Sequence, residues 1–302
     1  MQSDIARTTQ RTYKQKVKRY KVFCKSNKLK TFSENSSCIF ITYLARNLAF
    51  KTLLTYTAAI KKYIKRYRTA SYVKRFTALK QLLLGLKRIL CKTKRNSPRL
   101  PILHKELKLL KLYCSKLPCP QDGRMLWCAI TFGFFGFLRA SEMVSKSQST
   151  YERSRTLTVS HVKLYRKHVK VHIECAKNDQ YRNGTNVILA KNRGSCCPHR
   201  ATKAYLHVRK PTDGPFLTFN DGTYLTNKKL NDHIRAALPH SINGKYSSHS
   251  LRIGAATVAA SRGYPKYIIQ KLGRWRSTVF KKYIRFNDAT YIQISKGLAT
   301  TN

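Results

Sequence analysis

The spacing of the apolar residues changes once along this chain of 302 residues, at a polar and basic stretch near residue 96. Before that stretch, apolar residues recur every three or four positions, which is the spacing of amphipathic helices. Four such runs lie at 13–23, 39–48, 53–64 and 76–90. Residues 1–95 contain no run that alternates like a strand, so we expect a small bundle of helices there.

The stretch KTKRNSPRLP at 92–101 carries two prolines and reads as an exposed connection, with the linker proper at 96–101. Residues 102–302 then form a second domain with a mixed pattern. Helical spacing at 103–117 and 122–137 precedes alternating β-branched runs at 156–162, 168–175 and 186–190, and short helical runs return between 199 and 284. The predicted fold is mainly α with a small antiparallel β-sheet: a helical bundle followed by an α+β domain.

Basic residues outnumber acidic ones along the whole chain, with 61 Lys and Arg against 12 Asp and Glu and a net charge of +49. Residues 1–100 carry 26 basic and 2 acidic side chains, so the charge is not confined to a tail. A hydrophobic content of 42% is enough for real cores and excludes a disordered polycation. A folded chain with such a positive field is expected to bind nucleic acid. In the first domain we expect phosphate contacts from Lys14, Lys18, Lys61, Lys65 and Arg66.

The same composition disfavours several other classes of protein. So few carboxylates make an acidic two-metal nuclease centre improbable, and Cys196, Cys197 and His199 stand too close together for a zinc site without a second ligand pair. The longest apolar run, 127–138, is too short to cross a bilayer. Residues 1–20 lack the apolar core of a secretory signal, so the nine cysteines are expected to be reduced. We expect no metal, no cofactor, no membrane partner and no small-molecule substrate.

Two short motifs carry candidate chemistry. In the sequence SSHSLR at 247–252, His249 and Arg252 are three residues apart and project from one face of a first helical turn, whose free N–H groups favour a phosphate. Such a pair alone is more often structural than functional. Arg139 follows a very apolar helix, where a core would not accept an unpaired charge, and Glu142 is close enough to orient it.

The order of these motifs resembles that of the tyrosine recombinases, the phage-integrase-like family. The resemblance rests on Leu-Arg-x-Ser-Glu at 138–142, Ala-Lys-Asn-Asp at 176–179, His-x-x-Arg at 249–252, Gly-x-Trp at 273–275 and Tyr283. It is most similar to recombinases of eukaryotic DIRS, Ngaro and Crypton mobile elements. It covers residues 125–300 and is looser over 1–95, where only the helical, basic character fits a core-binding domain.

The resemblance implies a role for each motif residue. Arg139 and Arg252 clamp the scissile phosphate, and Tyr283 is the nucleophile. Lys177 protonates the leaving 5′ oxygen, and His249 acts as the general acid/base. Trp275 occupies a position that is His in many members; its indole donates a hydrogen bond but transfers no proton.

The resemblance also implies a function for the whole chain. It predicts a metal-independent site-specific recombinase or integrase that cleaves and rejoins double-stranded DNA through a 3′-phosphotyrosine, for integration or excision of a mobile element. Four protomers are expected on two DNA sites, docked through a C-terminal helix within 284–301. The compartment is the nucleus in a eukaryotic host and otherwise the cytoplasmic nucleoid. Two alternatives stay open. One is a non-catalytic DNA-binding protein derived from a recombinase. The other is a type IB topoisomerase, which is disfavoured because topoisomerases of that type have Lys-x-x-Arg at the position where this chain has His249-x-x-Arg252.

Overall fold

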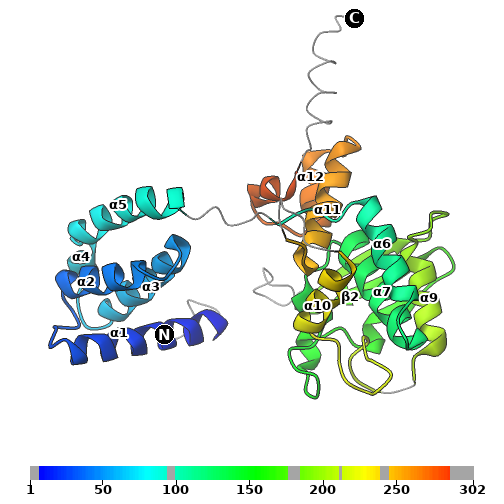
Figure 1. Cartoon of the computed structure of the whole chain (residues 1–302), viewed down its shortest axis with the longest axis horizontal. Helices are drawn as coiled ribbons and strands as arrows, with labels where there is room; N and C mark the ends of the chain where they lie inside the picture. The colour runs from blue at the N-terminus through cyan, green and yellow to red at the C-terminus, as the bar shows by residue number, and fades with distance from the viewer. Residues whose placement is uncertain (1–6, 94–98, 176–183, 211–212, 239–244, 286–302) are drawn as a thin grey trace, which may run out of the picture. The chain divides into compact units, whose positions relative to one another are not determined.

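The computed structural model describes residues 7–93, 99–175, 184–210, 213–238 and 245–285 (Figure 1). The chain divides into two units, Met1–Asn96 and Ser97–Asn302. The boundary falls within the polar stretch at 92–101 where the spacing of apolar residues changes. Most of the described residues are helical, and a single three-stranded sheet accompanies them, as the sequence predicts.

Helices joined by short turns make up the described residues of the first unit. Its helices are α1 (Arg7–Ser26), α2 (Glu34–Ala45), α3 (Phe50–Ile64), α4 (Ala70–Lys74) and α5 (Thr77–Thr93). Tyr20, Phe40 and Ile60 are fully buried between them. Ser33 caps α2 by accepting a hydrogen bond from the Ser36 N–H at 3.0 Å. The Glu34 carboxylate accepts from the Leu79 N–H at 2.8 Å and so ties the start of α5 to the start of α2.

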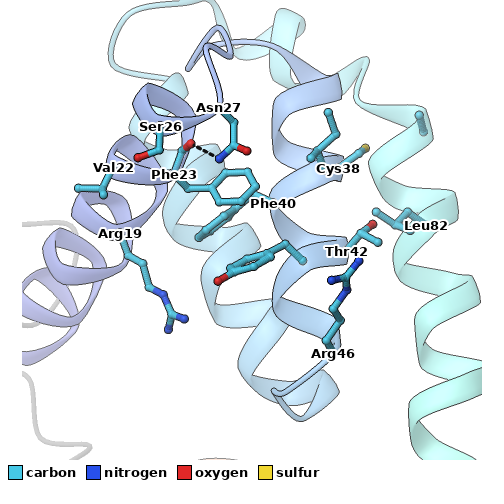
Figure 2. A pocket seen from close by; sticks show the side chains of 13 residues that line it. Arg19, Val22, Phe23, Ser26, Asn27, Cys38, Phe40, Thr42, Arg46 and Leu82 are labelled. Atoms are coloured by element: carbon cyan, nitrogen blue, oxygen red, sulfur yellow. Dashed lines mark hydrogen bonds between the residues drawn. The ribbon is translucent and has the colours of Figure 1, made fainter.

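A groove of about 890 Å³ lies between α1, α2 and α5 of this unit (Figure 2). Its lining includes the apolar side chains of Val22, Phe23, Phe40 and Leu82, together with two arginines, Arg19 and Arg46. It contains none of the residues of the sequence motifs. An apolar floor is poorly suited to a phosphodiester backbone, and the motif residues that the structure describes all lie in the second unit.

The second unit is built around a buried helix, α7 (Pro120–Phe135). Helices α6 (His104–Ser115), α9 (Pro198–Val208) and α11 (Ser248–Ser261) pack against it. The other helices are α8 (Ala140–Met143), α10 (Asn227–Ala237) and α12 (Lys266–Leu272), with 3₁₀ turns η1 (Arg153–Arg155), η2 (Val159–His161) and η3 (Thr278–Tyr283). No helix among the described residues of either unit has the length and apolar character needed to span a membrane.

The sheet is antiparallel with strand order β1-β2-β3, formed by Val162–Leu164, His168–Ile173 and Thr185–Ala190. Alternate residues of β2 face the core, as the period of a half-buried strand requires. The prediction of a strand at 156–162 was wrong, because the strand begins only at Val162. Before it, the His161 N–H donates to the Thr158 carbonyl at 3.1 Å and closes a 3₁₀ turn, while the Leu157 carbonyl accepts from the Phe216 N–H. The tight hairpin expected near residues 177–185 falls mostly on 176–183, which lie outside the described residues.

Candidate active site

Helix α11 places the His-x-x-Arg motif at its first turn. Ser247 is the N-cap, and its backbone N–H donates to Ser250 Oγ at 3.1 Å. One turn later, a Cβ on Gly254 would lie 1.8 Å from the Ile102 carbonyl oxygen. Only glycine therefore permits the close approach of Ile102, whose N–H donates to the Ser250 carbonyl at 3.1 Å. This contact fixes the start of α11, from which His249 and Arg252 project.

Arg252 is fully buried at the centre of the site. Its Nη1 donates to the Phe137 carbonyl and its Nη2 to the Gly273 carbonyl. The guanidinium carbon lies 4.3 Å from the centre of the Trp275 ring and 5.8 Å from that of Tyr283. Burial, reinforced by the positive charge of Arg139, lowers the pKa of Arg252 to about 9. The side chain thus remains charged at neutral pH, and a bound anion would relieve the cost of burying that charge.

Glu142 lies between two arginines. Arg139, the N-cap of α8, donates from Nη1 to Glu142 Oε1 at 2.7 Å and from its backbone N–H to Oε2 at 2.9 Å. Arg274 Nη2 donates to the same Oε2 at 2.9 Å. Burial alone would raise the pKa of Glu142, but the charges of Arg274 and Arg139 and the hydrogen bonds hold it below its usual range. The sequence-predicted partnership of Glu142 with Arg139 is therefore present, with a second arginine added.

Arg274 is the residue that the sequence argument missed. Besides Glu142, it binds the carbonyls of Gly136 and Phe137 at 3.1 Å each, so the Phe137 carbonyl accepts from both Arg252 and Arg274. Arg274 and Phe137 both adopt a left-handed backbone, with φ of 53° and 50°. The only signal in the sequence was its position inside the Gly-x-Trp motif, because Gly136, Phe137 and Glu142 lie more than 130 residues away in the chain.

Tyr283, the predicted nucleophile, sits at the end of η3 beside His249 and Trp275. Its ring centre lies 5.0 Å from that of His249 and 4.8 Å from that of Trp275. Its backbone carbonyl accepts from Thr257 Oγ1 at 3.2 Å, which ties the segment to α11. Side chains from 139 to 283 in the chain are thus brought into one cluster.

The Gly-x-Trp motif has a steric explanation. A Cβ on Gly273 would lie 1.8 Å from a ring atom of Trp275, so the indole packs directly over the glycine backbone. Trp275 is buried there and lies against Arg252 and Tyr283. The indole therefore packs within the site, and the hydrogen bond that the resemblance implies for it stays a prediction.

The cluster is rich in hydrogen-bond donors and poor in acceptors. Arg139 and Arg274 share the carboxylate of Glu142, and Arg252 donates to two backbone carbonyls. Arg252 Nε, Arg274 Nε and Trp275 Nε1 are buried and have no hydrogen-bond partner among the residues that the structure describes. Buried donors without acceptors are costly. An anionic ligand such as a phosphate would supply the missing acceptors and negative charge.

The remaining predicted residues lie elsewhere. Lys177 is outside the described residues. Lys14 and Lys18 are exposed on α1, Lys65 and Arg66 are exposed where α3 ends, and Lys61 is half-buried on α3. In the described part of the chain, no three His, Cys, Asp or Glu side chains are placed to hold a metal ion. Cys197 instead caps α9, which begins at Pro198, and its Sγ accepts from the Asn192 N–H.

We expect Glu142→Gln to lower the free energy of unfolding by about 3 kcal/mol, because it removes a buried carboxylate that is the counter-ion of two partly buried arginines. The pKa of Glu142 is lowered in the folded chain, so its contribution is present above the pKa of an unfolded glutamate and is lost as the pH falls. Urea unfolding, followed by the fluorescence of the chain's two tryptophans, both in the second unit, would measure it.

Glu152→Gln is the matched control, since Glu152 pairs with Lys146 and Arg155 at the surface. We expect that substitution to cost less than about 1 kcal/mol. The difference between the two variants should shrink at acid pH. Equal losses for Glu142→Gln and Glu152→Gln at neutral pH would contradict a structural role for the buried carboxylate.

Comparisons with known proteins give a clear result only at the level of structure. No protein-family model matches the chain, and no curated protein matches its sequence. Among solved structures, the Tn1549 transposon integrase in complex with circular intermediate DNA is 12% identical, with a TM-score of 0.64 over 98% of this chain and 96% of that one. The same integrase with transposon right end DNA is 13% identical, with a TM-score of 0.61 over 99% and 96%.

A third similar structure is the XerH site-specific recombinase bound to a palindromic difH substrate. It is 15% identical, with a TM-score of 0.58 over 89% of this chain and 73% of that one. These likenesses span both units and concern architecture, because the identities are low. Together with the mainly helical chain and its three-stranded antiparallel sheet, they show that this protein has the fold of the tyrosine recombinases.

Proposed function

We propose that this chain is a site-specific DNA recombinase or integrase that cleaves and rejoins double-stranded DNA with Tyr283 as its nucleophile. The observation that carries the proposal is the position of Tyr283 beside His249 and above Arg252. Tyr283 is 31 positions from Arg252 and 34 from His249 in the sequence, yet the three residues meet around a cluster of unpartnered donors.

The proposed cleavage is a single exchange at phosphorus. The Tyr283 oxygen bonds to the scissile phosphorus, and the bond from phosphorus to the 5′ oxygen breaks, which leaves the protein joined to the 3′ phosphate. The proton of the tyrosine hydroxyl passes to His249, and we assign the proton that the 5′ oxygen acquires to Lys177. Rejoining reverses these steps, and no nucleotide cofactor is needed because the phosphotyrosine retains the energy of the broken bond.

The arginines stabilise the charge that develops on the non-bridging oxygens. Guanidinium groups stay charged and bind phosphate oxygens in pairs. Arg139 is held by Glu142 and keeps a partly exposed side chain, whereas Arg252 is covered by Trp275 and Tyr283. We infer that Arg139 meets the phosphate first and that Arg252 is reached when Tyr283 moves toward the DNA. Donors arranged in advance in this way are a main source of rate enhancement.

The test of the proposed function is a suicide substrate. A duplex nicked near the cleavage site loses a short fragment after attack, so the covalent intermediate accumulates. We expect a protein–DNA adduct that survives denaturing electrophoresis and disappears after proteinase treatment. Binding to the same duplex without any adduct would favour a non-catalytic DNA-binding protein.

Cleavage is expected to proceed at its full rate in excess EDTA, because arginines take the role that divalent cations have in metal-dependent phosphoryl transfer. The measurement is the initial rate of adduct formation with EDTA, with added Mg²⁺ and with neither. A strict requirement for Mg²⁺ would overturn this mechanism.

The wider role follows as a proposal from the resemblance. We propose action on a mobile element of the DIRS, Ngaro or Crypton type, by four protomers on two DNA sites, in the nucleus of a eukaryotic host or otherwise in the nucleoid. The first unit would serve as the core-binding domain, with phosphate contacts from Lys14, Lys18, Lys61, Lys65 and Arg66. The C-terminal helix assigned to assembly lies outside the described residues, and deletion of 288–302 should leave binding to one site while abolishing recombination.

A further inference from the structure

A cluster of aromatic rings in the first unit joins Phe32, in the turn before α2, to residues at the end of α3 and the start of α4. Phe32 and Tyr63 are stacked, with ring centres 5.6 Å apart and planes within 20°. Tyr67 lies 5.3 Å from Phe32 and 5.4 Å from Tyr63. Tyr72 joins the cluster through its hydroxyl, which donates to the Phe32 carbonyl at 3.1 Å.

Arg68 stands between two of these rings. Its guanidinium carbon lies 5.9 Å from the ring centre of Phe32 and 6.0 Å from that of Tyr72. An arginine held against aromatic faces presents a flat, charged surface of the kind on which a nucleobase stacks. The cluster is therefore not a purely apolar patch.

The outer members of the cluster remain open to solvent. Tyr67 is 60% exposed and Tyr72 is 38% exposed. A tyrosine ring in a folded core is ordinarily covered, as Tyr20 is in the same unit. Exposed rings held in place by other rings offer a stacking surface at little entropic cost, because their orientation is already set.

The charged side chains next to the cluster's tyrosines in the sequence are all basic. Lys65, Arg66, Lys74 and Arg75 are all exposed. The sequence contains no Asp or Glu between Glu34 and Glu106, and the Glu34 carboxylate is bound to the Leu79 N–H. The cations near the rings are therefore available to phosphates.

We propose that the surface formed by Phe32, Tyr63, Tyr67, Arg68 and Tyr72 binds single-stranded nucleic acid by stacking unpaired bases on its tyrosines. A duplex covers the faces of its bases with their neighbours, so exposed rings cannot stack on them as they can on unpaired bases. Rings combined with a basic surround are the common design of proteins that bind single strands. This activity is separate from strand cleavage, since none of these residues belongs to the Tyr283 site.

The experiment compares three fluorescein-labelled probes by anisotropy, using the full-length protein. The probes are oligo-dT and oligo-rU of about 12 nucleotides and a DNA duplex of the same length. The variants are Tyr67→Ala and Tyr72→Ala, with Tyr67→Phe as the conservative change. Tyr43→Ala is the matched control, because Tyr43 is an exposed tyrosine on α2 outside the cluster. Thermal melting checks that each variant is folded.

We expect each of Tyr67→Ala and Tyr72→Ala to weaken binding of the single strands about tenfold, with duplex affinity unchanged. Tyr67→Phe and Tyr43→Ala should bind all three probes like the wild type. Equal affinities for oligo-dT and oligo-rU are expected if the protein contacts only the faces of the bases. A higher affinity for one of them would show that the protein also contacts the sugar. Equal losses on duplex and single strands, or no loss on the single strands, would overturn the proposal. Because the duplex arm and the suicide substrate are separate measurements, failure of this site leaves the proposed cleavage intact.

Discussion

Tyr283→Phe is expected to abolish the covalent protein–DNA adduct while leaving DNA binding unchanged. The substitution removes only the hydroxyl oxygen, which is the atom proposed to bond to phosphorus. The ring contacts with His249 and Trp275 are retained, and the hydrogen bond from Thr257 reaches the backbone carbonyl and not the side chain. The site should therefore keep its shape, so the loss reports chemistry and not folding.

The measurement is adduct formation on the nicked duplex, with affinity for an intact duplex measured in parallel. Tyr264→Phe is the matched control, since Tyr264 is an exposed tyrosine of the same unit that lies outside the Tyr283 cluster. It should form the adduct at the wild-type rate. Adduct formation by Tyr283→Phe would show that another tyrosine attacks, and Tyr291 would be the next to test.

Arg252→Ala is expected to slow cleavage by about 10²- to 10³-fold, the loss typical of a deleted donor to a developing oxyanion. Arg139→Ala should cost a similar factor. Arg252 also has a structural role. Its removal leaves the Gly273 carbonyl without that donor, and the Phe137 carbonyl then accepts from Arg274 but no longer from Arg252. Thermal melting must therefore accompany the rate measurement.

Two further variants separate the catalytic from the structural effect of Arg252. Arg252→Lys retains the positive charge but not the paired donors, and it should fold while cleaving more slowly than the wild type. Arg262→Ala changes an exposed arginine at the end of the same helix and should cleave normally. A loss of less than about fivefold in a folded Arg252→Ala protein would mean that this side chain does not act on the phosphate.

Local features of the sequence were enough to predict the longer helices and two pairs of residues in the site. The three- to four-residue spacing of apolar side chains predicted the longer helices of both units but not the short α4 and α8, and the separation of His249 from Arg252 placed both on the first turn of α11. These features depend on residues that lie within about one helical turn of each other in the sequence. The pairing of Arg139 with Glu142 was accessible for the same reason, since it spans only three residues.

Tertiary structure alone decided the rest of the site. Arg274 binds a carboxylate 132 residues away, and Arg252 donates to a carbonyl 115 residues away, distances at which the sequence carries no periodic signal. Tertiary structure also decided the segment 156–162, which was wrongly expected to be a strand. Its residues Leu157 and Thr158 pair with the segment at Pro215 and Phe216 and not with the three-stranded sheet. Apolar spacing determined which segments become helices, but the close packing of distant backbones determined which arginines share Glu142 and which ring covers Arg252.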